Sequence, residues 1–296
     1  MATNRRKKTL TAALAICVTC LGTASAQLAS SRQLSALSSN DSIVALREKA
    51  RNKPLQEAFQ SVSLRLHPLD DRATARNIII IGFVGGFVSD DDVKHPEVQF
   101  AALLRNTYSS GIHTEVFSNH HGKEALHRVL QRVDLNGDGR ISDSEKEQAD
   151  IVIYGHSWGA SQTVTLARAL GEQGLPVLLT IQVDSVRKPG QEDSIITPNV
   201  KNAINFYQTK GLIHGRSTIQ AADPTQTRIL GNFQMDYRNR RINCDNYPWL
   251  ARHFDKPHHK IENDPRVWNQ IASGIDSELS KTTPMVAGSV QSELMP

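Results

Sequence analysis

The chain has 296 residues, with 34 basic and 30 acidic side chains and a formal net charge of +4. Residues 5–8 supply four of the basic side chains, and the first 26 residues contain no acidic one, so the rest of the chain carries 30 of each sign. Nucleic-acid binding needs a net basic face, so this balance argues against that class of protein. The cluster Arg238, Arg240 and Arg241 is expected to be a solvated surface loop.

The N-terminus has the pattern of a secretory signal peptide, residues 1–26. The basic residues 5–8 precede an apolar run from Leu10 to Leu21, and small residues follow at Ala24 and Ala26. This order predicts cleavage before Gln27 and a secreted or periplasmic protein. The apolar run is shorter than the ~20 residues that span a bilayer, which argues against a transmembrane anchor.

The cysteines bear on anchoring and on disulfides. Neither Ile16 before Cys17 nor Thr19 before Cys20 is the small residue that a lipoprotein signal usually has there, so we expect no stable membrane anchor after cleavage. Cleavage would leave Cys244 as the only thiol, which excludes an intramolecular disulfide. A domain of this length can bury a sufficient core without one. The oligomeric state is not predicted.

Residues 27–75 are mixed and polar and are expected to form an N-terminal surface segment. The hydrophobic pattern changes at Asn77. Residues 78–81 form a run of four isoleucines, typical of a parallel strand that is buried on both faces. A domain over residues 76–275 is predicted from this point. The small, polar residues 276–296 are expected to be a flexible tail.

Helical and strand patterns alternate through this domain. Helices are predicted at 96–108, 123–133, 160–170, 199–208 and 265–271, and further strands at 112–117, 151–154, 176–183 and 229–235. Alternating strands and helices predict the α/β class, with a mostly parallel central sheet and helices on both of its faces.

Residues 155–159, Gly-His-Ser-Trp-Gly, match the motif G-x-S-x-G. The motif alone is weak, but here it follows a predicted strand and leads directly into a predicted helix. That is the strand-turn-helix of a nucleophile elbow, in which glycines permit the tight turn and the serine hydroxyl projects from the carboxyl edge of the sheet. Ser157 is therefore the candidate nucleophile, and the alternative is a serine in an ordinary turn.

On this motif the chain resembles the α/β-hydrolase family, over about residues 77–271. The resemblance implies an oxyanion hole made of two backbone N–H groups, one from Trp158 after the nucleophile and one from the loop after an earlier strand. Phe83 in the sequence Gly82-Phe83-Val84-Gly85-Gly86 is the best single candidate for the second. The same glycines do not fit the dinucleotide-binding spacing G-x-G-x-x-G, and no organic cofactor is expected.

The resemblance also implies the order serine, acid, histidine. Asp184 closes the strand that follows the nucleophile helix, a placement similar to that of pancreatic-type lipases, and Asp223 and Asp236 are its competitors. For the base, residues 257–265 precede the last predicted helix, where the family carries its histidine loop. His258 fits this position best, with His259 and His253 as alternatives.

Residues 134–145 match the twelve-residue loop of an EF-hand. Oxygen-bearing residues stand at positions 1, 3, 5, 9 and 12, a glycine at position 6 and an apolar residue at position 8. The predicted Ca²⁺ ligands are Asp134, Asn136, Asp138, the backbone carbonyl of Arg140, Ser142 and Glu145. Sensor EF-hands act in pairs and the chain has one such loop, so a structural role is expected for the ion.

Together these patterns predict a secreted serine esterase or lipase that acts on a small-molecule or lipid ester. A thioesterase or amidase would use the same residues, since a fold alone does not choose the substrate. A non-catalytic module that binds calcium and a partner is the alternative from another class. The acyl chain and the alcohol part of the substrate are not predicted.

Overall fold

The computed structural model describes residues 76–108 and 111–282. The expected signal peptide, the segment 27–75 and residues 283–296 lie outside the described residues. In the part that is described, six strands form one sheet in the order β2-β1-β3-β4-β6-β8, and every neighbouring pair is parallel. The strands are β1 (Asn77–Val84), β2 (Ile112–Ser118), β3 (Ala149–His156), β4 (Val177–Val183), β6 (Val200–Tyr207) and β8 (Arg228–Gln234). A separate parallel pair joins β5 (Ile195–Ile196) to β7 (Gln220–Ala221).

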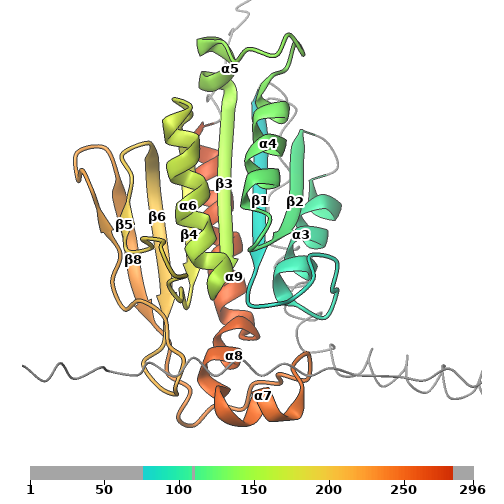
Figure 1. The fold of residues 1–296 in the computed structure, drawn as a ribbon, viewed down its shortest axis with the longest axis vertical. Helices are drawn as coiled ribbons and strands as arrows, with labels where there is room; N and C mark the ends of the chain where they lie inside the picture. Colours follow the sequence, from blue (N-terminus) through green and yellow to red (C-terminus); the bar gives the residue numbers. More distant parts are fainter. Residues whose placement is uncertain (1–75, 109–110, 283–296) are drawn as a thin grey trace, which may run out of the picture. The chain divides into compact units, whose positions relative to one another are not determined.

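Helices cover both faces of this sheet, as Figure 1 shows with α4 and α6 in front and α9 behind. On one face lie α4 (Gly122–Val133) and α6 (Trp158–Glu172), whose apolar side chains pack on alternate residues of β1 and β3. On the other lie α3 (Pro96–Thr107) and α9 (Pro265–Thr282). The shorter helices are α5 (Asp143–Gln148), α7 (Trp249–Phe254) and α8 (Lys256–Glu262). The predicted α/β class with a parallel sheet and helices on both faces is confirmed.

The helix predicted at 199–208 is wrong, because these residues form strand β6. The apolar residues Val200, Ala203, Ile204 and Tyr207 have the i, i+3, i+4, i+7 spacing of a helix, which explains the error. In the structure Val200 and Ala203 pack on one face of the sheet while Ile204 and Phe206 pack on the other. A strand buried on both faces shows no alternation of apolar and polar residues, so its period is hidden.

Two further boundaries differ from the sequence prediction. Helix α9 continues to Thr282, so its last residues are not the flexible tail expected from 276, and Glu278 and Leu279 are buried in its last turns. Strand β1 runs to Val84, beyond the predicted end of its isoleucine run. No helix among the described residues is both long enough and apolar enough to span a membrane.

The strand order fixes where a ligand can approach. The chain runs from β1 outward to β2, then returns to β3 on the other side of β1, so the order reverses between β1 and β3. In open parallel sheets, ligands bind outside the carboxyl ends of the strands at such a reversal point. The glycine-rich segment after β1 and the Ser157 motif after β3 both lie there.

Candidate active site

Ser157 lies at a sharp turn between β3 and α6. Its backbone has φ 57° and ψ −123°, a conformation that is costly for a residue with a Cβ and that is typical of functional sites. Gly155 and Gly159 make the turn possible, because a Cβ on Gly155 would lie 2.6 Å from the Gly159 backbone and one on Gly159 would lie within 2.4 Å of the Phe83 carbonyl oxygen. The local structure is the strand-turn-helix that the motif predicts.

The structure brings the predicted serine, histidine and acid into one hydrogen-bonded chain. His258 Nε2 lies 2.9 Å from Ser157 Oγ, and His258 Nδ1 lies 2.7 Å from Asp184 Oδ2. All three residues are buried. His258 stands on α8, a helix where the sequence predicted a loop. In this arrangement the imidazole can accept the serine proton through Nε2 while the carboxylate fixes the tautomer through Nδ1.

Asp184 is held by four hydrogen bonds from three segments. Its Oδ1 accepts from the backbone N–H groups of Gln208 and Gly215, and its Oδ2 accepts from the side chains of Gln208 and His258. Burial opposes the charged form, but these bonds outweigh it and lower the pKa of the Asp184 carboxyl. Asp184 has φ 46°, and it and Ser157 are the two non-glycine residues with positive φ among those described.

The competing acids and histidines lie outside the hydrogen-bonded chain that leads to Ser157. Asp223 accepts hydrogen bonds from Thr225 and Gln226 in an exposed turn, and Asp236 pairs with Arg238 at the surface. The two alternative histidines, His259 and His253, pack against aromatic rings. His259 stacks on Tyr247 with ring centroids 3.8 Å apart, and His253 packs against Trp249. The hydrogen-bonded chain to Ser157 runs through His258.

The two predicted oxyanion donors, Trp158 and Phe83, lie in different kinds of structure. Trp158 is the first residue of α6, so its N–H belongs to the first turn, whose donors have no partner within the helix. Phe83 is buried inside the paired part of β1, opposite Phe117 and Gly155, and is not in the loop after the strand. The loop residue against the nucleophile is Gly85, where an added Cβ would lie 3.0 Å from Ser157 Cβ.

Sequence reasoning missed the residues that hold this machinery. The buried Asn119 side chain donates to the carbonyl oxygens of Val84 and Gly86, and so fixes the loop next to Ser157. Lys188 Nζ in turn donates to the Asn119 side chain. The Gln208 side chain likewise holds Asp184 in position, because it donates to the Asp184 carboxylate. None of these residues lies in a motif, so only the fold identifies them.

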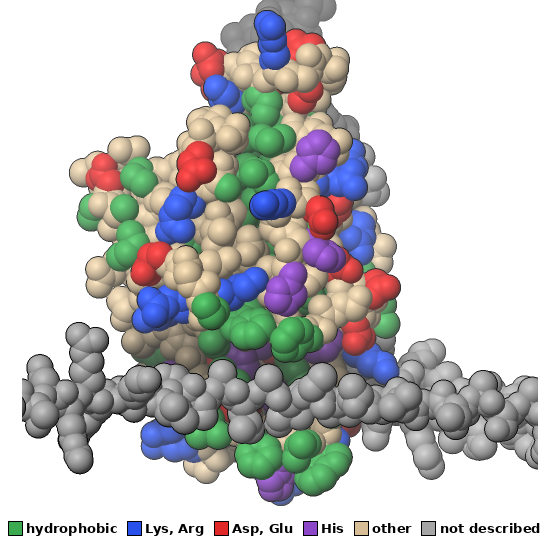
Figure 2. Space-filling model, viewed as in Figure 1, with side chains coloured by type: hydrophobic (Ala, Val, Ile, Leu, Met, Phe, Trp, Pro, Cys, Tyr) green, Lys and Arg blue, Asp and Glu red, His purple; other side chains and the backbone are tan. Residues whose placement is uncertain are grey.

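Exposed hydrophobic side chains lie on the segments next to the triad. Phe87, 89% exposed, meets the Trp158 ring at 5.6 Å between centroids. Others stand on α7, just before His258, and in the segment between Gln208 and Gly215, the two residues that bind Asp184: Leu212, Ile213, Trp249, Leu250 and Phe254. Figure 2 shows hydrophobic side chains gathered over α7 and over the N-terminal end of α6.

The predicted calcium loop connects α4 to α5 near the start of β3, at the opposite end of that strand from Ser157. The Asp134 carboxylate accepts from the backbone N–H groups of three following residues, and Gly139 at position 6 has φ 77°. Glu145 accepts from Ser142 and from the backbone at the start of the loop. The side-chain donors are all oxygens, which suits calcium. The carboxylates of Asp134, Asp138 and Glu145 are not gathered within 4.8 Å of one another, so binding of an ion would have to bring them closer together.

No protein-family model and no curated protein matches the chain. Among solved structures, human thioesterase 2 is similar at 12% identity and a TM-score of 0.40, covering 70% of this chain and 98% of that one. An arylesterase is similar at 11% identity and a TM-score of 0.38, covering 70% and 76%. A cutinase-like protein from Cryptococcus sp. is similar at 11% identity and a TM-score of 0.35, covering 69% and 96%. At this level of similarity, function has to be inferred from the chain's own residues.

Proposed function

We propose that this protein is a serine hydrolase of the α/β-hydrolase type that cleaves carboxylic esters through an acyl-enzyme on Ser157. The observation that carries the proposal is the continuous chain of hydrogen bonds from Ser157 Oγ through both nitrogens of His258 to Asp184. The positive φ of Ser157 supports it, because strain of this kind at a buried serine next to an imidazole is typical of a nucleophile elbow.

In the first half of the reaction, Ser157 Oγ attacks the ester carbonyl carbon while His258 Nε2 takes the hydroxyl proton. The C–O bond to the alcohol then breaks, and His258 returns the proton to the departing alkoxide. Asp184 stays ionised and stabilises the imidazolium between these two transfers. In the second half, His258 takes a proton from water, the hydroxide attacks the acyl carbon, and the acid leaves as Ser157 regains its proton.

Negative charge on the carbonyl oxygen develops only in the transition state. We assign its stabilisation to the N–H of Trp158 at the start of α6 and to an N–H of the loop at Gly85 and Gly86, in place of Phe83. One such donor typically lowers the barrier by about 2.7 to 4 kcal/mol. The helix N-terminus adds a favourable partial positive charge. Asn119 keeps the loop in position by binding its carbonyl oxygens.

The substrate we propose has an apolar acyl or alcohol part. Exposed Phe87 lies beside Trp158, which directly follows the nucleophile. Leu212 lies between Gln208 and Gly215, which bind Asp184, and Trp249 lies on α7, the helix that precedes the one carrying His258. Exposed hydrophobic side chains near a reactive group favour binding of an apolar ligand. A thioester is the second candidate, because the same nucleophile and base act on it without change.

We also propose export of the protein, on the signal-like pattern of residues 1–26, and a structural Ca²⁺ in the loop 134–145. The fixed turn around Asp134 and the all-oxygen side-chain donor set support the ion. When bound, it would neutralise the acidic side chains of the loop and tie α4 to α5, which leads into the strand that ends at Ser157. No step of the reaction passes through it.

The direct test is hydrolysis of matched ester, thioester and amide substrates across a range of acyl lengths, with wild type, Ser157→Ala and Phe87→Ala. We expect ester cleavage that Ser157→Ala abolishes, and a preference for longer acyl chains that Phe87→Ala weakens. Faster thioester than ester turnover would favour the second candidate. Activity that survives Ser157→Ala would refute the proposal, and inactivity on every substrate would favour a non-catalytic module.

A further inference from the structure

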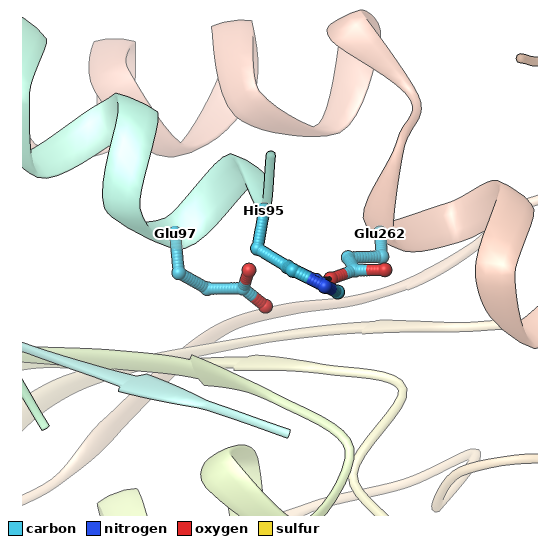
Figure 3. Close-up of side chains that lie close together, drawn as sticks. All are labelled: His95, Glu97 and Glu262. Atoms are coloured by element: carbon cyan, nitrogen blue, oxygen red, sulfur yellow. Dashed lines mark hydrogen bonds and ion pairs between the residues drawn. The ribbon is translucent and has the colours of Figure 1, made fainter. Parts of the chain in front are cut away.

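Next to the triad lies a second polar cluster that the reaction does not use. It consists of His95 just before α3, Glu97 in the first turn of α3, His156 at the end of β3 and Glu262 at the end of α8. Their exposed fractions are 3%, 0%, 1% and 1%. Figure 3 shows the carboxylates of Glu97 and Glu262 on either side of the His95 ring. Four titratable side chains thus share one buried space.

The distances within the cluster are those of groups that face one another. His95 Nδ1 lies 2.7 Å from Glu262 Oε1. His156 Nδ1 lies 3.7 Å from Glu97 Oε1 and 3.9 Å from Glu262 Oε1. Ligand atoms of His95, Glu97 and Glu262 all fall within 4.8 Å of one another, and among the described residues this is the one group of three or more His, Cys, Asp or Glu that does so. His156 lies beside this group and is not a member of it by that distance.

Several of these atoms lack a hydrogen-bond partner. Both carboxylate oxygens of Glu97 and both ring nitrogens of His156 are buried and unpartnered. A buried carboxylate without a donor loses its hydration without compensation, which costs several kcal/mol. Burial and the neighbouring charge of Glu262 raise the pKa of Glu97 well above its usual value, and burial lowers the pKa of His156 to about 3. The polar neighbours of these two side chains include each other and Glu262.

A divalent cation would give the Glu97 carboxylate and one ring nitrogen of His156 the partner that each lacks. Two carboxylates and two neutral imidazoles around a 2+ ion form an electroneutral set, which removes the cost of burying two acidic groups together. In a tetrahedral zinc site with bonds of about 2.0 to 2.1 Å, the ligand atoms are about 3.3 Å apart. The two His156 contacts, 3.7 and 3.9 Å, are longer than this value, and the 2.7 Å His95–Glu262 pair is shorter. Binding would therefore draw His156 toward the other three residues and open the His95–Glu262 pair.

We propose that His95, Glu97 and Glu262, with His156 as the fourth ligand, form a buried binding site for a divalent transition-metal ion of the zinc type. Mixed imidazole and carboxylate ligands favour such an ion over calcium, which prefers oxygen alone. The surroundings resemble the outer shell of a metal site, since the other His95 nitrogen faces Asp92 and the Tyr247 hydroxyl binds Glu262.

The ion in this site would be structural. It joins α3, β3 and α8, three elements far apart in the chain, and α8 carries His258. The His156 ring lies 4.6 Å from the His258 ring between centroids, so the metal would hold in place a ring that packs against the imidazole of His258. The inference does not depend on the proposed hydrolysis, because the proposed ligand atoms are not the reacting groups of Ser157, His258 and Asp184.

The rival explanation is a shared proton, in which neutral Glu97 donates to ionised Glu262. The substitution Glu97→Gln distinguishes the metal site from the shared proton. A neutral amide replaces a neutral acid with little effect, whereas a lost carboxylate ligand removes the ion. Glu278→Gln is the matched control, since Glu278 is also buried and lies on α9 away from the cluster. Asp134→Asn is used as the background, so that metal held by the exposed loop is not counted.

The experiment measures metal content by mass spectrometry after the full-length chain is stripped with a chelator and dialysed against Zn²⁺, together with the melting temperature. We expect about one zinc per chain in the Asp134→Asn background and in Glu278→Gln, a fall below about a tenth in Glu97→Gln, and a zinc-dependent rise in melting temperature that Glu97→Gln loses. Absence of bound zinc in the parent, or equal zinc in Glu97→Gln, would overturn the site.

A spectroscopic measurement needs no variant and keeps the proposal testable if Glu97→Gln does not fold. Zinc-edge X-ray absorption of the loaded protein should show nitrogen and oxygen ligands at about 2.0 to 2.2 Å, including the signature of two imidazoles. Sulfur ligation, or oxygen ligands without imidazole, would exclude this set of residues. Both readouts are independent of ester hydrolysis, so their failure and the failure of the proposed function are distinguishable.

Discussion

The proposed triad and the proposed calcium loop are built in opposite ways. His258 is separated by 101 residues from Ser157 and by 74 from Asp184, and all three side chains are buried. In the loop, the hydrogen bonds of Asp134 reach at most five residues along the chain and those of Glu145 at most ten. Much of the loop is also exposed to solvent.

This difference predicts different responses to change. The proposed triad depends on where β3 and β4 end and where α8 begins, so it exists only when the whole sheet is folded. We expect its residues to serve chemistry more than stability. The loop depends on its own twelve residues and serves the connection of α4 to α5. We therefore expect triad substitutions to affect activity with little effect on melting, and loop substitutions to do the reverse.

The largest effect is expected from Ser157→Ala. Loss of the nucleophile should reduce kcat by about 10⁶-fold. The melting temperature should stay close to that of wild type, because the hydroxyl has one buried partner and alanine fits the same space. Steady-state kinetics and thermal melting check this, and unfolding caused by the substitution would contradict the separation of activity from stability.

Asp184→Asn should follow, with a fall in kcat of about 10⁴-fold, because the amide can no longer hold the His258 tautomer or stabilise the imidazolium. Asp223→Asn, at the exposed competitor, is the matched control and should retain full activity. Equal losses in the two variants would remove Asp184 from its assigned role.

Gln208→Leu should have a smaller effect, about 10- to 100-fold on kcat with KM nearly unchanged, since Gln208 positions Asp184 without touching substrate. Its hydrogen bonds help to hold the pKa of Asp184 low, so their loss raises that pKa. Asp184 then becomes protonated earlier as pH falls, and the acidic limb of the pH profile should move to higher pH. Gln234→Leu, at an exposed glutamine, should move neither kcat nor the limb.

Calcium removal should act on stability. With the ion at 100 times its Kd, binding contributes about 2.7 kcal/mol, which for a domain of this size corresponds to a melting shift of about 5 to 10 °C. Addition of EGTA should lower the melting temperature by this amount and leave activity at 25 °C within about two-fold. Asp134→Asn should abolish the shift. A large loss of activity at unchanged melting temperature would contradict the expectation that the loop serves stability and not catalysis.

The smallest effect concerns the first turn of α5. Ser142 and Glu145 form a capping box there, in which each side chain binds the other residue's backbone N–H. Ser142→Ala should lower the free energy of unfolding by about 1 kcal/mol. Denaturant titration in EGTA isolates the cap from calcium binding, and Ser144→Ala, one residue inside α5, is the control.

The sequence was most informative where a pattern is local. The elbow around Ser157 and the loop from Asp134 each depend on neighbouring residues. The structure contains the strand-turn-helix of the elbow, and the calcium site in the loop stays a prediction. Asp184 and His258 could be ranked among competitors only through the order of elements in a family resemblance, and the fold is what brings them together.

Other features could not be predicted from the sequence because they depend on contacts between residues far apart in the chain. Strand β6 has helical spacing of its apolar residues and is a strand because both of its faces are covered. Phe83 was placed after β1 because the isoleucine run ends before the strand does. His95 and Glu262 are 167 residues apart, so no spacing in the sequence could indicate that they meet.

The central claim is that Ser157 is a nucleophile activated by His258. Reaction of the folded protein with a fluorophosphonate, followed by peptide mass mapping, tests it without knowledge of the substrate. We predict one phosphonyl adduct on Ser157, lost in Ser157→Ala and strongly slowed in His258→Ala, while His253→Ala reacts like wild type. An unlabelled Ser157 in wild-type protein, or labelling that is indifferent to His258, would contradict the account.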